Sequence, residues 1–205
     1  FDKPKEWSEE NLAALATKLR EQTKPMIIAC NKIDVAGAKD NLIKLKETFP
    51  KYTFIACSSE SELALKEAAK HDLVEYVPGG NDFIINKENN LSEKQKQALD
   101  FIKSSILDKF SSTGVQQVLD NAVFNLLGYI PIFPGGASKL EDKDGNTLPD
   151  CFLMPPSSTA LDFAYKLHTD LGKNFIRAID VRTKKTVGKD HLLKARDVIE
   201  IVAGR

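Results

Sequence analysis

Four consecutive residues, Asn31-Lys32-Ile33-Asp34, follow a short apolar run and carry side chains that can read a purine base. Guanine presents two adjacent donors, the ring N1–H and the exocyclic amine, and an ionised aspartate offers two acceptor oxygens that match them. We therefore assign base reading to Asp34, whose carboxylate would face a lone pair on adenine. The Asn31 amide can bridge the base and nearby backbone, and the methylenes of Lys32 can lie along the base plane.

A second polar run, Cys57-Ser58-Ser59-Glu60, ends the next apolar stretch along the chain. If both runs lie at one sheet edge, the backbone N–H of Ser59 can point at the guanine O6 acceptor, and the Ser58 hydroxyl can brace Asp34. The predicted cofactor is GTP, and the predicted cofactor-binding residues are Asn31, Lys32, Asp34, Ser58, Ser59 and Glu60.

The elements around these motifs have to bring them together. The apolar runs at 26–30 and 53–57 suit strands that are buried on both faces, and each is preceded or followed by residues at helical spacing. Ser8 is the expected N-cap of the first helix, and the next helix is expected over about 39–48. Strands that alternate with helices predict a parallel α/β sheet, and ligands collect at the carboxyl ends of such strands.

The chain changes character twice after this sheet. Capped amphipathic helices are expected at Ser92, with Gln95 as the capping-box partner, and at Thr113, with Gln116 in that role. From Tyr129 onward, short apolar strands alternate with turns, and a single helix is expected to begin near Thr159. We predict a nucleotide-binding α/β part over 1–90, a helical segment over 91–128 and a small mixed sheet with one crossing helix over 129–205.

The sequence resembles GTPases of the translation-factor-related class, and within it the Obg-related, YchF-like branch found in archaea. The resemblance rests on the Asn31 to Asp34 motif and on the runs 58–65, 110–116 and 122–124. The last part, with its run 164–170, looks like a TGS domain, a module shared with threonyl-tRNA synthetases and stringent-response enzymes. The resemblance implies the carboxyl-terminal part of a P-loop GTPase sheet over 1–90, a helical segment, and a β-grasp (ubiquitin-like) TGS domain.

The resemblance also bears on the choice of nucleotide. Bacterial members of this branch tend to replace the guanine-reading motif and prefer ATP, so the presence of Asn31, Lys32 and Asp34 favours GTP. Ser59 stands where alanine is commoner in the family. This difference has little consequence, because the backbone of that residue would contact the base.

The sequence contains no Gly-x-x-x-x-Gly-Lys-Ser/Thr stretch, the loop that cradles phosphate and supplies a Mg²⁺ ligand. We therefore expect a fragment of a GTPase whose phosphate-binding half is missing, and its start at Phe1 agrees with a cut. Alone, it should bind GTP weakly and hydrolyse none, with Mg²⁺ bound only in the intact parent protein. No residue is predicted to be catalytic or to bind a metal.

The charges balance, with 29 basic and 29 acidic residues, and no apolar run is long enough to span a bilayer. We expect a soluble, cytoplasmic protein without a membrane partner. Bases nevertheless outnumber nearby acids in the last part. TGS domains are thought to contact RNA or ribosomal partners, so the candidate RNA-binding residues are Arg177, Arg182, Lys184, Lys185, Lys189, Lys194 and Arg196.

The alternative hypothesis is a non-enzymatic module that binds RNA or protein and carries an inert nucleotide motif. Replacing Asp34 with asparagine separates the two hypotheses. The substitution should shift or weaken guanine binding in an intact protein under the first hypothesis and do nothing under the second.

Overall fold

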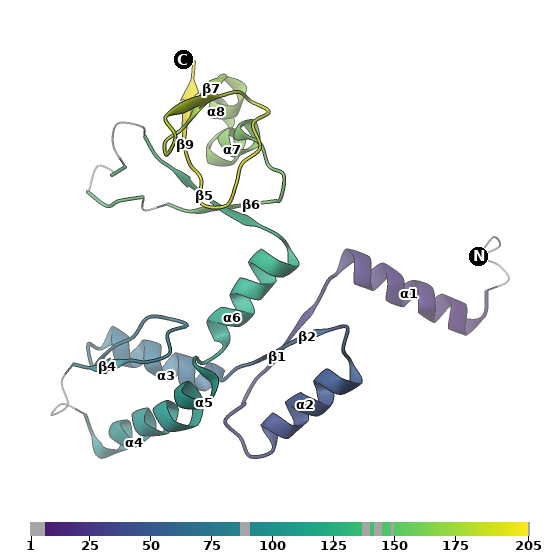
Figure 1. Cartoon of the computed structure of the whole chain (residues 1–205), viewed down its shortest axis with the longest axis vertical. Helices are drawn as coiled ribbons and strands as arrows, with labels where there is room; N and C mark the ends of the chain where they lie inside the picture. The colour runs from purple at the N-terminus through teal and green to yellow at the C-terminus, as the bar shows by residue number, and fades with distance from the viewer. Residues whose placement is uncertain (1–6, 87–90, 137–139, 142–144, 149, 205) are drawn as a thin grey trace. The chain divides into compact units, whose positions relative to one another are not determined.

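The computed structural model describes residues 7–86, 91–136, 140–141, 145–148 and 150–204 (Figure 1). It contains two compact units, Phe1–Ala122 and Val123–Arg205, and each is described by itself. The sequence predicts a separate helical segment over 91–128. The division between the two units lies inside that range, and Leu91, Leu99, Ile102, Ile106 and Leu107 of the range belong to the core of the first unit.

The first unit opens with the alternation that the sequence predicts. Strands β1 (Ile27–Cys30) and β2 (Thr53–Ala56) pair in parallel, with Ile27 opposite Thr53. The helices around them are α1 (Glu9–Thr23), α2 (Ala38–Thr48) and α3 (Ser59–Lys70). Ser8 caps α1 by accepting the Asn11 N–H at 3.3 Å. The predicted parallel α/β architecture is confirmed.

The rest of the first unit is mainly helical. A short antiparallel pair, β3 with β4, follows α3 and is not predicted by the sequence. The elements are β3 (Val74–Glu75), β4 (Ile84–Ile85), α4 (Glu93–Ile102), the π-helix η3 (Lys103–Leu107), α5 (Asp108–Phe110), α6 (Val115–Asp120) and the π-helix η4 (Asn121–Leu126), which crosses the division between units.

One of the two predicted caps in this region is right and the other is wrong. Ser92 and Gln95 form the expected capping box at the start of α4. The N-cap of α6, however, is Gly114 rather than Thr113, and it caps without a side chain. Gly114 has φ of +79°, a left-handed conformation that glycine adopts without a steric cost. The Thr113 hydroxyl donates instead to the carboxylate of Glu62.

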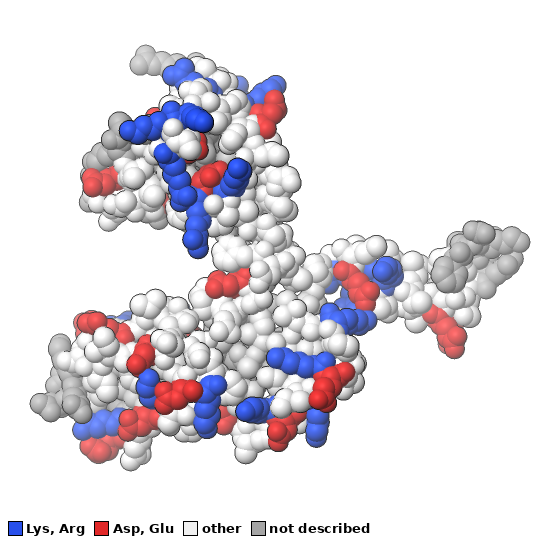
Figure 2. All heavy atoms as spheres, in the orientation of Figure 1, with Lys and Arg blue, Asp and Glu red and all other residues white. Residues whose placement is uncertain are grey.

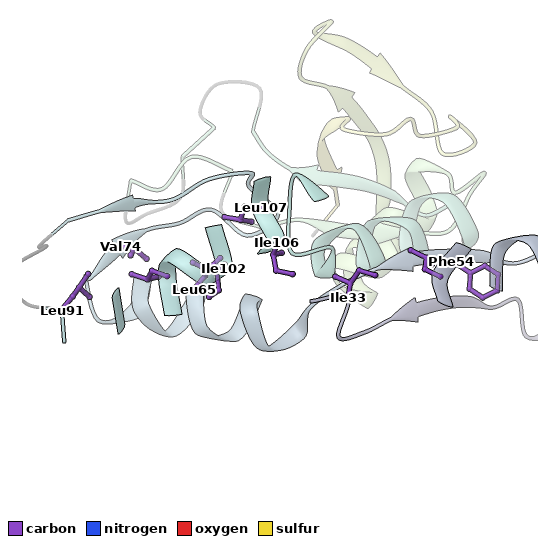
Figure 3. Close-up of a cluster of buried hydrophobic side chains, with 10 residues drawn as sticks. Ile33, Phe54, Leu65, Val74, Leu91, Ile102, Ile106 and Leu107 are labelled. Carbon is purple, nitrogen blue, oxygen red and sulfur yellow. The ribbon is translucent and has the colours of Figure 1, made fainter. Parts of the chain in front are cut away.

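The core of the first unit joins the sheet to the later helices, as Figure 3 shows. Its buried apolar residues come from β2, β3, the loops and the helices α2, α3, α4 and η3: Ile33, Leu42, Phe54, Leu65, Val74, Leu91, Leu99, Ile102, Ile106 and Leu107. Ile33 belongs to this core, so burial anchors the middle of the polar motif. The apolar stripe of α1 is outside it, with Leu12 51% and Leu19 50% exposed.

The second unit is a five-stranded mixed sheet with helices packed against it. The strand order is β6-β5-β9-β7-β8, with β5 and β9 parallel and the other neighbours antiparallel. The elements are β5 (Ile130–Pro134), β6 (Phe152–Met154), α7 (Ala160–Leu167), α8 (Thr169–Lys173), β7 (Phe175–Asp180), β8 (Lys185–Val187) and β9 (Val198–Ala203). This order is that of a β-grasp sheet, as the TGS resemblance implies.

Helix α7 covers the core of this sheet. Phe163 and Ala164 of α7 are buried with Ile132, Ala178 and Ile199 of the strands. The expected capping box of Thr159 and Asp162 is present. The sequence predicts only one helix here, but the short α8 follows α7 directly. It was missed because its N-cap is His168, whose Nδ1 accepts the Asp170 N–H at 3.2 Å, and histidine is not a usual cap residue.

Candidate functional site

The two polar motifs lie side by side where β1 and β2 end. Backbone bonds continue the pairing beyond the strands, from the Cys57 N–H to the Cys30 carbonyl at 3.0 Å and from the Ile33 N–H to the Cys57 carbonyl at 3.2 Å. The carboxyl ends of two parallel strands therefore carry both loops at one edge. The strand–helix alternation in the sequence predicts this juxtaposition.

Asn31 connects the two loops directly. Its Oδ1 accepts the Lys32 N–H at 2.9 Å and the Ser59 N–H at 3.0 Å. Asn31 thus bridges to neighbouring backbone, as its amide was expected to do. The same contact occupies the Ser59 N–H that is predicted to reach guanine O6, so a base bound there would have to share or displace that hydrogen bond.

The motif backbone is held in an unusual conformation at Lys32. Its φ is +63°, in the left-handed region that residues with a side chain seldom adopt. The Lys32 carbonyl then accepts the Val35 N–H at 3.1 Å, which closes a turn around Asp34. Left-handed residues of this kind cost energy and are concentrated at ligand sites.

Asp34 has a buried side-chain oxygen that lacks a hydrogen-bond donor. Its Oδ1 is buried, and no described residue gives it a hydrogen bond. A buried carboxylate oxygen without a donor costs free energy that a ligand N–H can recover. The residues present therefore fit a ligand that brings donors, as guanine does at N1 and at its amine.

The expected role of Ser58 is wrong in this structure. Its hydroxyl lies 2.9 Å from the hydroxyl of Ser61 and accepts the Ser61 N–H at 3.4 Å, so it caps α3 rather than bracing Asp34. The physical reason is its position directly before a helix, where the first backbone N–H groups need acceptors.

A cavity of about 270 Å³ opens beside Asp34. Its lining combines the motif, the first turns of α3 and one face of α4: Asp34, Glu60, Ser61, Ala64, Ala98, Phe101 and Ile102. Glu60 is one of the residues that the sequence predicts, whereas the α4 residues are not. Nothing in the local sequence separates Phe101 from the rest of an amphipathic helix, and only the tertiary structure brings α4 to the motif.

Both cysteines near the site have a raised thiol pKa. Burial raises the pKa of the Cys57 thiol, and the neighbouring Cys30 raises it further. Burial also raises the pKa of Cys30. Both thiols therefore stay protonated at neutral pH and serve as small apolar groups. In the described part of the chain, no three His, Cys, Asp or Glu side chains gather where they could hold a metal ion.

The seven predicted RNA-binding residues all belong to the second unit, and all are exposed. Figure 2 shows Lys and Arg side chains gathered on the viewed face of this unit. Across the described residues, none of the seven forms an ion pair. Two nearby acids accept local hydrogen bonds instead. Asp180 accepts the backbone N–H of Arg182 and the Thr183 hydroxyl, and Asp197 accepts the backbone N–H of Lys194.

Comparison with known proteins agrees with this arrangement. Residues 29–135 match the family described as Obg-like GTPase YGR210-like, G4 motif-containing domain. The chain belongs to this Obg-like GTPase family. Residues 143–203 match the TGS domain, as the run 164–170 predicted. The matched span of the Obg-like GTPase model includes Asn31 to Asp34 and extends through α4 and α6.

Relatives of this chain come from archaea and yeast. A GTP-binding protein of Methanocaldococcus jannaschii is 46% identical over 203 residues, which are 98% of this chain and 51% of the relative. A crystal structure of a GTP-binding protein from Pyrococcus horikoshii OT3 has a TM-score of 0.70 and 40% identity, and the match covers 98% of this chain and 52% of that one. The structure of the Schizosaccharomyces pombe YchF GTPase shares the fold, with a TM-score of 0.51 and 15% identity. This match covers 96% of this chain and 48% of that one.

These matches confirm the YchF-like resemblance. They also show that the chain spans about half the length of the relatives it matches. No helix among the described residues has both the length and the apolar character needed to cross a bilayer.

Proposed function

We propose that this chain supplies the guanine-reading part of a GTP-binding protein and that Asp34 is the residue that selects the base. One observation carries the proposal: Asp34 holds a buried carboxylate oxygen without a donor, next to a loop pair that Asn31 already ties together. Membership of a GTP-binding family supports guanine nucleotide as the ligand.

Recognition would proceed by exchange of hydrogen bonds at this edge of the sheet. The N1–H and the amine of guanine donate to the two oxygens of Asp34, while O6 accepts the Ser59 N–H in place of, or together with, Asn31. The Lys32 methylenes cover one face of the base. Adenine has a lone pair at N1, so it would leave the carboxylate unsatisfied and would be rejected by a large factor.

Hydrolysis belongs, in this proposal, to the intact parent protein. The phosphate loop that would bind the β- and γ-phosphates and hold Mg²⁺ has no counterpart in these 205 residues. The 205-residue chain should therefore bind GTP and GDP weakly and with almost equal affinity, because the phosphates find few partners here.

Titration of the chain with GDP and with ADP, followed by backbone amide NMR, tests the proposal. We expect GDP to shift the amide resonances of Lys32, Asp34 and Ser59, and ADP to leave them unchanged at the same concentration. Equal shifts with both nucleotides, or none with either, would contradict it.

A second function follows from the basic residues of the TGS domain. We propose that they contact RNA, either free or in the ribosome, and that the protein acts in the cytoplasm. Seven exposed bases without ion pairs among the described residues support this, because each is available to neutralise a phosphate. Binding of a structured RNA by the chain should weaken steeply with salt, and an affinity that does not change with salt would contradict the proposal.

A further inference from the structure

Glu62 is buried where a carboxylate is costly. It lies in the first turns of α3 and is 6% exposed, whereas the next residue, Leu63, is 61% exposed. No cation pairs with Glu62 among the described residues. Its Oε2 instead accepts the Tyr76 hydroxyl at 2.7 Å and the Thr113 hydroxyl. The two hydrogen bonds that Glu62 accepts offset the cost of burying its carboxylate, and they explain why α3 buries this residue and exposes the neighbouring leucine.

Thr113 holds the same loop by a second contact. Its carbonyl accepts the Ser58 N–H at 2.8 Å, and its side chain is 1% exposed. Thr113 therefore binds the backbone just before Ser59 and, through Glu62, the helix turn just after it. One residue from the distant 111–114 segment fixes both ends of the short stretch that carries Ser59.

Gly114 brings this segment close enough to make those contacts. A Cβ on Gly114 would lie 1.9 Å from the Ala56 carbonyl oxygen, so only glycine permits this approach to the end of β2. The Gly114 N–H donates to the Ser112 hydroxyl at 3.1 Å, which gives the turn a fixed shape. The position of Thr113 is thus determined by backbone packing against the strand that leads into the site.

We propose that Thr113, acting with Glu62, is a positioning residue for guanine recognition. It does not touch the base. It keeps the Ser59 N–H where O6 of guanine can reach it, and its loss lets the loop between β2 and α3 move. This inference rests on the proposed guanine site and adds the residues that hold the O6 donor in place.

The proposal predicts an effect on O6 recognition that differs from the effect of Asp34. Inosine nucleotide keeps O6 and N1–H but lacks the 2-amino group that Asp34 would also read. Thr113→Val, which removes the hydroxyl at nearly constant volume, should weaken GDP and IDP binding by the same factor of about tenfold. Asp34→Asn should instead change the ratio of the GDP and IDP affinities.

The experiment measures GDP, IDP and ADP binding to the full chain by competition with a fluorescent GDP analogue. Thr113→Ser keeps the hydroxyl and should restore wild-type affinity. Leu99→Ala removes apolar volume from the same core at α4 and serves as a control for stability, so its GDP affinity should stay near wild type. Hydrogen exchange adds a second readout, because GDP should slow exchange of the Ser58 amide in wild type and less in Thr113→Val.

The outcomes separate this inference from the function it rests on. Wild-type affinity in Thr113→Val, with Asp34→Asn clearly changed, overturns the positioning role and leaves the guanine site intact. A loss in Leu99→Ala equal to that in Thr113→Val shows that stability alone is responsible and also overturns it. If wild type does not prefer GDP to ADP, both proposals fail. If Thr113→Val does not fold, a Thr113→Ser affinity tenfold below wild type overturns the hydroxyl's role.

Discussion

The Ser59 N–H lies 3.0 Å from Oδ1 of Asn31, and this hydrogen bond joins two loops that are 28 residues apart in the chain. It holds the two halves of the predicted base-reading edge together. A bridge within the protein reduces the ordering that a ligand would otherwise have to impose. In the proposed complex, the same bond would compete with guanine for the Ser59 donor.

Replacing Asn31 with alanine removes the acceptor that joins the loops. We expect a loss of stability of about 1 kcal/mol, because two backbone N–H groups lose a partner at an exposed position. We also expect faster hydrogen exchange at the Ser59 amide. Asn31→Asp is the matched control, since it keeps an acceptor oxygen and should keep the protection. Equal exchange rates in wild type and Asn31→Ala would show that the bridge is not formed in solution.

Gly114→Ala tests the close approach of the 111–114 segment to β2. The added Cβ would meet the Ala56 carbonyl and the residue would keep a positive φ, so we expect a loss of about 3 kcal/mol or more. Gly37 has a similar φ of +80° but open space around it. Gly37→Ala should cost only about 1 kcal/mol, from the left-handed backbone alone. Chemical denaturation of both variants measures the difference, and similar losses would contradict the packing.

Ionisation of Tyr76 should make the free energy of unfolding fall at alkaline pH. Burial, together with its hydrogen bond to the Glu62 carboxylate, raises the pKa of the Tyr76 phenol from 10.0 to about 12. The folded protein therefore retains a proton that the unfolded chain releases. This contribution is complete below pH 10 and is lost as the pH rises from about 10 to about 12.

Tyr76→Phe removes that titration. Denaturant unfolding at pH 8 and pH 11 should show a smaller fall in stability for Tyr76→Phe than for wild type, although the variant starts from a lower value. The comparison between the two proteins cancels the effect of other groups that titrate in this range. A fall of the same size in both would mean that Tyr76 keeps an ordinary pKa.

The basic residues of the second unit should act through phosphate contacts. Replacing Arg182 and Lys184 with glutamine should lower the slope of log affinity against log salt by about 2 for an RNA ligand, since each phosphate contact contributes about 1. Lys44→Gln with Lys46→Gln, on α2 of the first unit, removes the same charge and should leave the slope near that of wild type. A change of equal size in both double variants would argue for a general charge effect instead of a binding face.

The sequence predicts the helices and strands whose positions depend on local residue patterns. Apolar runs and caps located β1, β2 and the helices that follow them, and parallel pairing then placed Asn31 and Ser59 at one edge. The sequence does not predict contacts between residues that are far apart along the chain. Thr113 looked like a helix cap, and only the approach of Gly114 to β2 shows that its hydroxyl goes to Glu62. Phe101 likewise reaches the cavity beside Asp34 through packing that no local pattern encodes.

The role of Asp34 in base selection is the central claim, and Asp34→Asn with guanine and xanthine nucleotides tests it most directly. Asparagine keeps one acceptor for N1–H and replaces the other with an N–H donor, which suits the C2 carbonyl of xanthine and repels the C2 amine of guanine. We predict that wild type binds GDP more tightly than XDP and that Asp34→Asn reverses this order. Unchanged affinities for both nucleotides in a folded Asp34→Asn variant would contradict the claim.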